Sequence, residues 1–208
     1  PYISDTLYDI ASAVRKDKRI LMEGAQGVGL DVDFGTYPYV TSSSPSSGGA
    51  LTGSGIPPKA VTRVVGILKA YVTRVGEGVF PTEDTGRGGE QLREIGHEYG
   101  ATTGRPRRCG WFDAVEAYYA CMLCGVTDIA LTKIDVLDSF AKIPFATAYL
   151  DGAKKITKFP AATSYLETLR PSYKNFAGWE HDTTSVARYK YFPAKMKTYI
   201  AAIEKASG

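Results

Sequence analysis

Residues 112–131 read Phe-Asp-Ala-Val-Glu-Ala-Tyr-Tyr-Ala-Cys-Met-Leu-Cys-Gly-Val-Thr-Asp-Ile-Ala-Leu, and this stretch decides the fold class. Its first part carries apolar residues at helical spacing and predicts an amphipathic helix over residues 112–124: Phe112, Val115, Tyr119, Met122 and Leu123. Asp113, near the start, suits the positive end of the helix dipole. Residues 126–131 then form a short apolar run that predicts a buried strand. A helix followed at once by a buried strand indicates an α/β fold.

Other periodic segments extend this α/β expectation outward. Residues 19–22 (Arg-Ile-Leu-Met) predict a second buried strand, and residues 143–156 predict an antiparallel hairpin that turns at Asp151-Gly152. Helical spacing recurs in three more segments: residues 4–14, 57–71 and 191–206. We therefore expect one domain with a mostly parallel central sheet from the Leu21 and Ile129 regions, flanking helices, and a small antiparallel hairpin near Phe145.

Composition narrows the function classes. The chain carries 25 basic and 22 acidic residues, and the net charge of +3 is too small to predict a general affinity for nucleic acid or membrane. No apolar run approaches the roughly 18 residues that cross a bilayer. Its 3 cysteines are too few for a disulfide framework and favour a reducing, cytoplasmic setting. Cys121 and Cys124 form a lone C-x-x-C, for which buried thiols are favoured over a metal or redox site.

Residues 100–111, Gly-Ala-Thr-Thr-Gly-Arg-Pro-Arg-Arg-Cys-Gly-Trp, combine three kinds of anion-binding donor. Backbone N–H groups freed by glycine, threonine hydroxyls, and the guanidinium groups of Arg105, Arg107 and Arg108 all favour phosphate or carboxylate oxygens. The loop ends just before a predicted helix N-terminus, which is a place suited to anions. A solvated basic turn, or a nucleic-acid patch built on the same three arginines, is the alternative.

Residues 132–135, Thr-Lys-Ile-Asp, lie at the end of the predicted strand over residues 126–131. The carboxylate of Asp135 can accept hydrogen bonds from N1–H and the N2 amino group of guanine, while the methylenes of Lys133 lie against the base. Adenine presents neither donor, so the arrangement would select guanine. It resembles the Asn-Lys-x-Asp motif of GTPases with Thr132 in the Asn place, although so short a string also occurs by chance.

Several other residues have both a functional and a structural interpretation. Asp31 and Asp33 are a candidate pair for acid–base work or metal binding, but two residues apart on a turn they are more often acceptors that shape the backbone. The turn with Gly76 and Gly78 either shapes a ligand pocket or simply reverses the chain. His97 has no other metal-type ligand at coordination spacing, so we expect a surface residue there.

Four strings in order along the chain are similar to the adenylosuccinate synthetase family: residues 21–27, 31–43, 100–111 and 131–138. The resemblance implies a ligase of the AMP branch of purine biosynthesis, which joins IMP to L-aspartate and converts GTP to GDP and phosphate. In that family the purine oxygen attacks the γ-phosphate, and the aspartate amine then displaces the phosphate. Mg²⁺, a cytoplasmic location, a homodimer, and the absence of nucleic-acid and membrane partners are further implications.

The resemblance also implies roles for individual residues. The IMP-binding residues would be Gln26, Thr41 and Arg105. The loop that closes on aspartate would comprise Ala101, Thr102, Thr103, Gly104, Arg105, Pro106 and Arg107. The GTP-binding residues would be Arg107, Lys133, Ile134 and Asp135, and the residues that shape the pocket would be Val75, Gly76 and Gly78.

The chain also departs from the family pattern. The family's phosphate loop with its catalytic Asp, the catalytic His downstream of it, and a C-terminal Ser-Thr-Gly-Pro stretch have no counterpart in residues 1–208. We therefore expect a central-to-C-terminal part of a larger synthetase domain, with no catalytic residue and no metal ligand, and catalytically silent alone. A stand-alone guanine-nucleotide binding module is the alternative.

Overall fold

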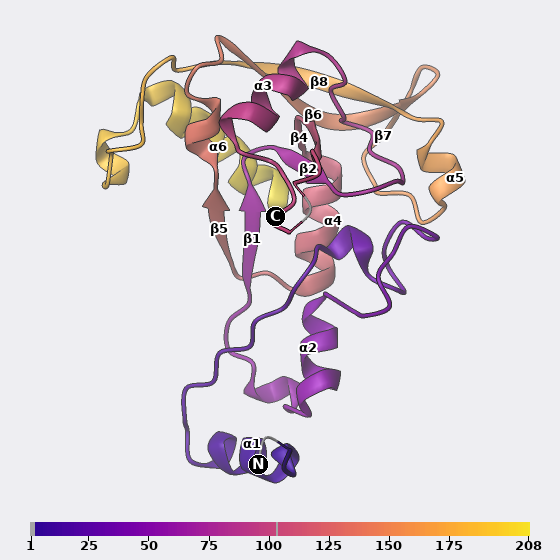
Figure 1. Ribbon diagram of the computed structural model, residues 1–208, viewed down its shortest axis with the longest axis vertical. Helices are drawn as coiled ribbons and strands as arrows, with labels where there is room; N and C mark the ends of the chain where they lie inside the picture. The colour runs from indigo at the N-terminus through magenta and orange to yellow at the C-terminus, as the bar shows by residue number, and fades with distance from the viewer. Residues whose placement is uncertain (1–2, 103) are drawn as a thin grey trace.

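The computed structural model describes residues 3–102 and 104–208. Its helices and strands, in chain order, are α1 (Thr6–Arg15), α2 (Ser47–Ser54), β1 (Val65–Lys69), β2 (Val72–Arg74), α3 (Arg87–Ile95), β3 (Arg108–Gly110), β4 (Phe112–Asp113), α4 (Ala114–Cys124), β5 (Asp128–Thr132), β6 (Lys142–Asp151), β7 (Lys154–Ile156), α5 (Thr163–Leu166), β8 (Arg170–Ala177) and α6 (Ala194–Ser207) (Figure 1). Within the described ranges, none of these helices is long and apolar enough to cross a membrane.

The strands form three small sheets rather than one large one. β1 and β5 pair in parallel, and β2 and β3 pair antiparallel. β6 is the centre of the third sheet, where β7 and β8 run antiparallel to it and β4 pairs in parallel over only Phe112 and Asp113. The α/β class is therefore confirmed, whereas the prediction of a mostly parallel central sheet is wrong.

Two segments account for this difference. Residues 19–22 form no strand: Leu21 is 92% exposed, and a short apolar run does not by itself determine a structure. Residues 57–71 form no long helix, because a 3-10 turn over Pro58–Ala60 is followed by β1. Valines recur there at helical spacing, but β-branched side chains favour strands, and the register opposite β5 decides the outcome.

Helix α4 forms where the sequence predicts it. The Asp113 carboxylate accepts hydrogen bonds from the backbone N–H groups of Val115 (3.0 Å) and Glu116 (3.1 Å), which are donors left free at a helix start. Gly125 ends the helix in the left-handed conformation. The predicted hairpin is confirmed as β6 and β7, and the predicted last helix is confirmed as α6.

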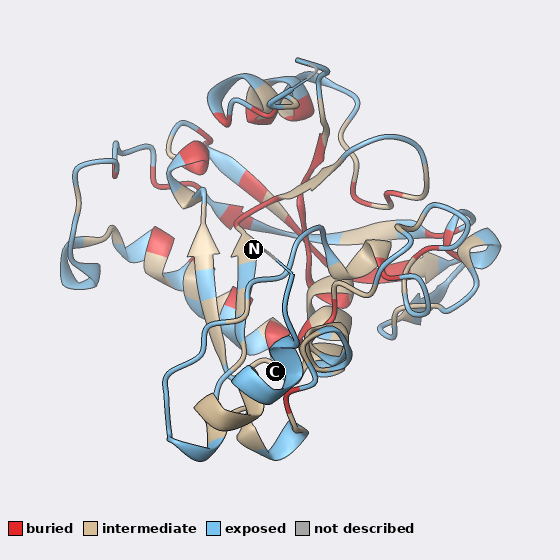
Figure 2. Cartoon of the chain, turned by 60° about the horizontal axis from the view of Figure 1, so that its bottom comes forward, coloured by how far each residue is buried: buried red, intermediate tan, exposed pale blue. Residues whose placement is uncertain are grey.

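The core lies between α4, α6 and the β6 sheet (Figure 2). Met196, Tyr199 and Ile203 of α6 are buried there. The ring of Tyr199 packs edge-on against Phe145, and its hydroxyl donates a 2.8 Å hydrogen bond to the carbonyl oxygen of Ala70 beyond the end of β1. The core thus supports the carboxyl ends of β1 and β5, where the predicted guanine motif lies.

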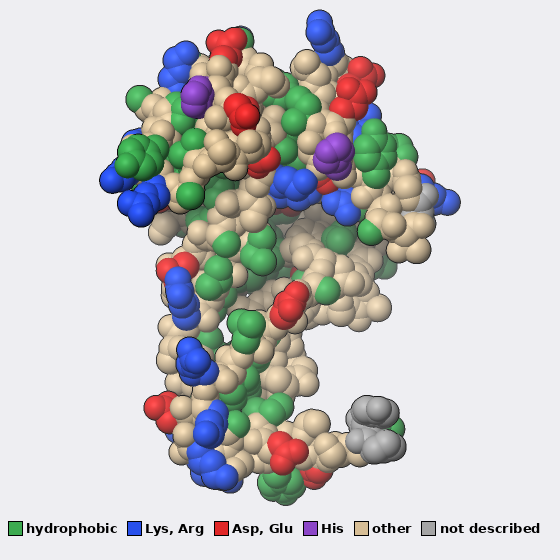
Figure 3. Space-filling model, turned by 60° about the vertical axis from the view of Figure 1, so that its left-hand side comes forward, with side chains coloured by type: hydrophobic (Ala, Val, Ile, Leu, Met, Phe, Trp, Pro, Cys, Tyr) green, Lys and Arg blue, Asp and Glu red, His purple; other side chains and the backbone are tan. Residues whose placement is uncertain are grey.

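The N-terminal part is built differently. α1 has the predicted position but buries none of its residues, and Asp5 makes no side-chain cap. It lies at the narrow lower end of the molecule, away from the wide part that holds the core (Figures 1 and 3). Ile3, Leu7 and Tyr8 are exposed. Helical periodicity is therefore present in α1 without a packed interior.

Candidate functional site

The predicted guanine motif follows β5 directly. Thr132 anchors the strand end, because its carbonyl accepts from the Ala70 N–H (3.0 Å) and its hydroxyl donates to the carbonyl of Leu68 (3.1 Å). Lys133 then takes the left-handed conformation (φ 60°), which is uncommon for a residue with a β-carbon. Its ammonium donates a 2.8 Å hydrogen bond to the carbonyl oxygen of Gly96. The motif is thus tied to the segment after α3.

Asp135 lines a cavity of about 400 Å³. The other lining residues come from the same turn and from a loop before α6: Asp138, Ser139, Glu180, His181, Asp182 and Thr184. These two segments are distant in sequence, and the loop gave no signal in the sequence. The cavity exists because the fold brings them together.

Asp138 holds the two walls of this cavity together. Its carboxylate accepts from the indole N–H of Trp179 (2.5 Å), the backbone N–H of Thr183 (2.5 Å) and the hydroxyl of Thr183 (2.9 Å). Trp179 and Thr183 are both buried. Sequence reasoning missed this residue, since its partners lie more than forty positions away.

The predicted aspartate loop is exposed at its tip and closed at its base. The carbonyl of Arg105 accepts from Gly100 N–H (2.8 Å), and Gly104 N–H donates to the carbonyl of Gly100 (2.8 Å). Tyr99 and Pro106 form a bridge. Residues 101, 102 and 104–106 are exposed, and Thr103 lies outside the described residues. The loop is therefore presented to solvent on a paired stem.

Glu98 is a buried carboxylate at this stem. It is 1% exposed and accepts hydrogen bonds from Lys69 Nζ (2.6 Å), Tyr71 Oη (2.6 Å) and Arg107 Nη1 (2.8 Å). Burial alone would raise its pKa, but the hydrogen bonds from Lys69 and Tyr71 lower the pKa of Glu98 below its ordinary value. The prediction of a surface residue holds for its neighbour His97, which is exposed. Sequence reasoning made no prediction for Glu98.

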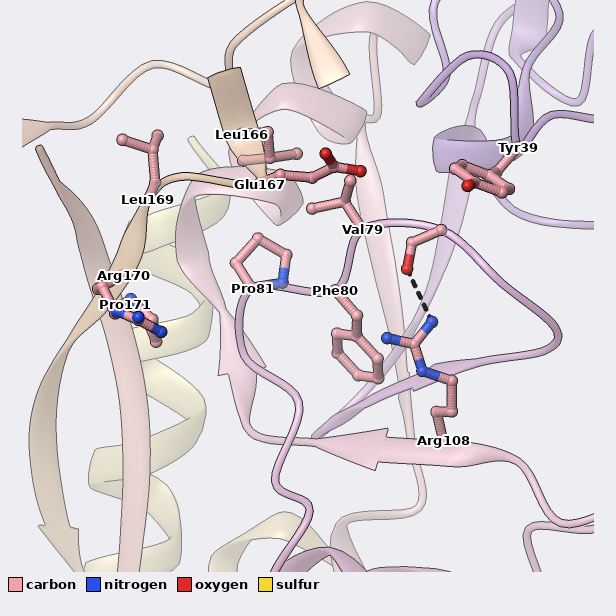
Figure 4. A pocket seen from close by; sticks show the side chains of 11 residues that line it. Tyr39, Val79, Phe80, Pro81, Arg108, Leu166, Glu167, Leu169, Arg170 and Pro171 are labelled. Atoms are coloured by element: carbon pink, nitrogen blue, oxygen red, sulfur yellow. Dashed lines mark hydrogen bonds between the residues drawn. The ribbon is translucent and has the colours of Figure 1, made fainter. Parts of the chain in front are cut away.

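The three arginines of the loop do not act together. Arg107 pairs with Glu98, while Arg108 forms a two-pronged ion pair with Glu83 and donates to the carbonyl of Gly78 (2.7 Å) (Figure 4). Arg105 is exposed at the loop tip. Arg107 and Arg108 are thus already neutralised by carboxylates, which disfavours the nucleic-acid patch.

The turn over residues 75–78 meets the loop that contains Thr41. Arg74 joins them: its Nε donates to the carbonyl of Glu77 (2.9 Å), and its Nη2 donates to the hydroxyl of Thr36 (3.2 Å) and the carbonyl of Tyr39 (3.3 Å). Beside this junction, Tyr39, Gly78 and Arg108 line a second cavity of about 350 Å³ (Figure 4). Sequence reasoning did not single out Arg74.

Asp31 has the structural role that its spacing suggested. It is fully buried and accepts from the backbone N–H groups of Asp33 (3.0 Å) and Phe34 (3.1 Å) and from the hydroxyl of Ser44 (2.6 Å). Those bonds hold the pKa of Asp31 below its ordinary value, against the effect of burial. Thr41 follows on the same loop, where its N–H donates to Leu30 (2.8 Å). Gln26 is exposed, with a positive φ of 63°.

A second pair of carboxylates lies behind this loop at the start of α4. Tyr149 Oη donates a 2.8 Å hydrogen bond to Asp113. Burial raises the pKa of Asp113, and burial together with the charge of Asp113 raises the pKa of Glu116. A carboxyl group whose pKa is raised in the folded protein destabilises the fold when it is ionised. The pair therefore makes the free energy of unfolding depend on pH.

Metal and thiol chemistry find little support in the described ranges. Within residues 3–102 and 104–208, no three His, Cys, Asp or Glu side chains are grouped so that they could hold a metal ion. The three cysteines are free; Cys109 and Cys121 are buried, and Cys124 is half-buried.

Comparison with known sequences gives a single family. The sequence model of a family described as adenylosuccinate synthetase matches residues 1–208. Adenylosuccinate synthetases of Bifidobacterium adolescentis and Komagataella phaffii are 48% and 47% identical to the chain, over 100% and 99% of its length. The matches cover 49% and 48% of those proteins, so the chain spans about half the length of the curated relatives it matches.

Solved structures agree with this result. The fully ligated adenylosuccinate synthetase from Plasmodium falciparum superposes with a TM-score of 0.94 at 40% identity, over 99% of this chain and 49% of that chain. A more distant likeness is the succinoaminodeoxyadenylate synthetase of cyanophage S-2L, with a TM-score of 0.54 and 26% identity over 62% of this chain and 40% of that one. That structure is bound to dGMP and to dATP as an energy donor.

Proposed function

The chain belongs to the adenylosuccinate synthetase family, and from this membership we propose that it takes part in the GTP-dependent joining of IMP to L-aspartate. In that reaction GTP phosphorylates the purine oxygen of IMP, and the aspartate amine displaces the phosphate, so that adenylosuccinate, GDP and phosphate are released. The residues of this chain bind and orient the substrates. Their roles divide into a guanine side, an aspartate side and an IMP side.

On the guanine side, Lys133, Ile134 and Asp135 read the base. The observation that carries the proposal is the position of Asp135 at a cavity of about 400 Å³, directly beyond the end of β5. The Asp135 carboxylate accepts from guanine N1–H and the N2 amino group. An adenine base offers no such donor pair and would leave the carboxylate unpaired.

On the aspartate side, the loop Ala101–Arg107 closes over the amino acid and Arg105 binds a carboxylate. The exposed tip and the paired stem suit a loop that moves as a unit. Arg107 reaches toward the GTP side. Within the described part of the chain, its Nε is a buried donor with no hydrogen-bond partner, and an acceptor from a ligand would remove this penalty.

On the IMP side, Gln26, Thr41 and Arg105 hold the nucleotide, and Val75, Gly76 and Gly78 shape its pocket. The link that Arg74 makes between the turn over residues 75–78 and the loop before Thr41 supports this grouping. Both segments present exposed residues at the junction, including Val75 at 70% exposure and Tyr39 at 37%.

The setting proposed for the protein follows from the family. We place it in the cytoplasm, where three free thiols are stable, and as a homodimer that uses Mg²⁺ with its GTP. Light scattering of the purified protein tests the dimer, with a monomer at micromolar concentration as the contrary result.

The guanine proposal is tested by titrating the chain calorimetrically with GDP, XDP and ADP. We expect the unchanged chain to prefer GDP to ADP by at least about tenfold. In Asp135→Asn the amide N–H₂ faces the guanine amino group, whereas xanthine presents a carbonyl oxygen there. The variant should therefore lose GDP affinity and gain XDP affinity, each by about tenfold or more.

The matched control is Asp128→Asn, at the opposite end of β5. Asp128 pairs with Arg63 on the surface and lines neither cavity, so its nucleotide preference should equal that of the unchanged chain. Equal binding of GDP and ADP by the unchanged chain would show that Asp135 does not read the base.

A further inference from the structure

Glu98 lies where two parts of the proposed site meet, the guanine-reading turn and the aspartate loop. Lys69, one of its partners, is the last residue of β1 and pairs in register with Thr132, immediately before Lys133. Arg107, another partner, closes the loop Ala101–Arg107. The backbone N–H of Arg107 also donates to the carbonyl oxygen of Glu98 (2.9 Å). Glu98 thus holds Arg107 through its backbone and its side chain.

The segment that carries Glu98 also holds the guanine motif. Lys133 Nζ donates to the carbonyl of Gly96, two residues before Glu98. Gly96 and Glu98 are both buried, and Glu98 N–H donates to the carbonyl of Arg93 (2.9 Å). The short segment from Gly96 to Glu98 therefore contacts Lys133 on one side and Arg107 on the other.

The charges at this point do not balance without Glu98. One carboxylate faces the ammonium of Lys69 and the guanidinium of Arg107, and the Tyr71 hydroxyl completes its hydrogen bonds. Removing the negative charge leaves two cations against the same buried position. Both cations are partly exposed, with 27% of the Lys69 side chain and 32% of the Arg107 side chain accessible. They can therefore relieve their mutual repulsion by turning toward water, and we expect them to move apart.

We propose that Glu98 is a positioning residue that fixes Arg107, and with it the stem of the loop Ala101–Arg107, relative to the guanine-reading turn at Lys133. This inference rests on the proposed function for its ligands, whereas the hold of Glu98 on Arg107 stands apart from any ligand. Glu98 touches no substrate in this scheme. It acts through Arg107, whose Nη1 it occupies.

The first test is limited proteolysis with trypsin under native conditions. The bond after Arg105 precedes Pro106 and resists trypsin, so cleavage at the loop stem falls after Arg107 or after Arg108. Mass spectrometry of the fragments distinguishes these two bonds. Glu98→Gln keeps the size of the side chain but removes its charge. We expect cleavage after Arg107 to become about tenfold faster or more, because local opening becomes easier. Cleavage after Arg15, in α1, serves as the internal standard and should not change.

The matched control is Glu94→Gln, which lies near the end of α3, four residues before Glu98, but is exposed. It should leave the cleavage rate unchanged. An unchanged rate in Glu98→Gln, or equal acceleration in the control, overturns the proposal. If Glu98→Gln shows no cooperative thermal transition, the same proteolysis test is made with Tyr71→Phe. This variant removes one of the hydrogen bonds to Glu98 and keeps all charges. Cleavage after Arg107 should then accelerate more weakly but still exceed the control.

The second test is a double-mutant cycle on GDP binding with Glu98→Gln and Arg107→Ala. If Glu98 acts through Arg107, each single variant weakens GDP binding about tenfold and the double variant is no weaker than Arg107→Ala alone. Additive losses overturn the coupling. If the unchanged chain binds no GDP, the proposed function fails, and the proteolysis result still decides whether Glu98 holds Arg107.

Discussion

Tyr149 on β6 and Asp113 at the start of α4 are joined by a 2.8 Å hydrogen bond between the phenol and a carboxylate oxygen, and both side chains are buried. The other oxygen of Asp113 caps α4. A single carboxylate therefore fixes the helix to the central strand of the third sheet. Glu116 lies one turn further along and feels the charge of Asp113.

Glu116→Gln should make stability less dependent on pH. The pKa of Glu116 is raised by burial and by Asp113, from 4.5 to about 7, so the folded chain binds more protons than the unfolded chain between about pH 4.5 and pH 7. Stability of the unchanged protein then falls as pH rises through this window, and the penalty is fully present above it. We expect the variant to be more stable at about pH 8 by on the order of 1 kcal/mol, with no advantage at about pH 4.

Urea denaturation at the two pH values measures this difference, with the exposed Glu94→Gln as control. An advantage of Glu116→Gln that is the same at both pH values would contradict the ionisation argument and indicate a packing effect.

Gly78→Ala and Gly76→Ala form a matched pair. Both glycines have positive φ, 107° and 74°, so each substitution carries backbone strain of about 1 kcal/mol. At Gly78 a β-carbon would also collide with the guanidinium of Arg74 and approach Tyr39 Cβ to 2.8 Å, whereas nothing lies within 4 Å at Gly76. We expect Gly78→Ala to cost about 2–3 kcal/mol and Gly76→Ala about 1 kcal/mol in thermal unfolding. If both substitutions lower the stability equally, the side chain of Arg74 moves away from the added β-carbon at no cost.

Asp138→Ala should loosen the wall of the cavity that Asp135 lines. The change leaves the indole N–H of Trp179 and the N–H of Thr183 without their acceptor, which costs about 2–4 kcal/mol. Chemical denaturation followed by tryptophan fluorescence measures the loss. Asp182→Ala is the control, because Asp182 lines the same cavity but bonds only to exposed Thr184. If Asp138→Ala leaves the free energy of unfolding unchanged, the two walls of the cavity stay together without the Asp138 carboxylate.

The elements that could be predicted from the sequence are those with local causes. The helix over residues 112–124 contains its capping residue, Asp113, and a helical spacing of apolar residues. The hairpin over residues 143–156 contains its turn, Asp151-Gly152. The valines around residue 64 satisfy a helical period and a strand alike, and only pairing with β5, over sixty positions away, separates the two. No local pattern could therefore decide that segment.

The same distinction holds for the candidate site. Lys133 and Asp135 follow a strand within one short string, so their position at its end was predictable. Glu98 was not, because its burial depends on Lys69, 29 positions away, and on the fold that brings β1 beside α3. Asp138 was missed for the same reason, since Trp179 lies 41 positions away. The burial and hydrogen bonds of such positioning residues depend on partners that are distant in sequence. These partners therefore produce no recognisable local pattern.

The exposed position of α1 affects how the unfolding of this protein is to be understood. Both tryptophans, Trp111 and Trp179, lie in the core, whereas α1 has no fully buried residue and only residues 10–14 are half-buried. We therefore expect α1 to open more easily than the core, without a change in the surroundings of either indole. Fluorescence follows the core alone, while circular dichroism adds the fraying of α1. A free energy of unfolding taken from fluorescence thus belongs to the core, and the opening of the N-terminal helix has to be followed by a probe of its own.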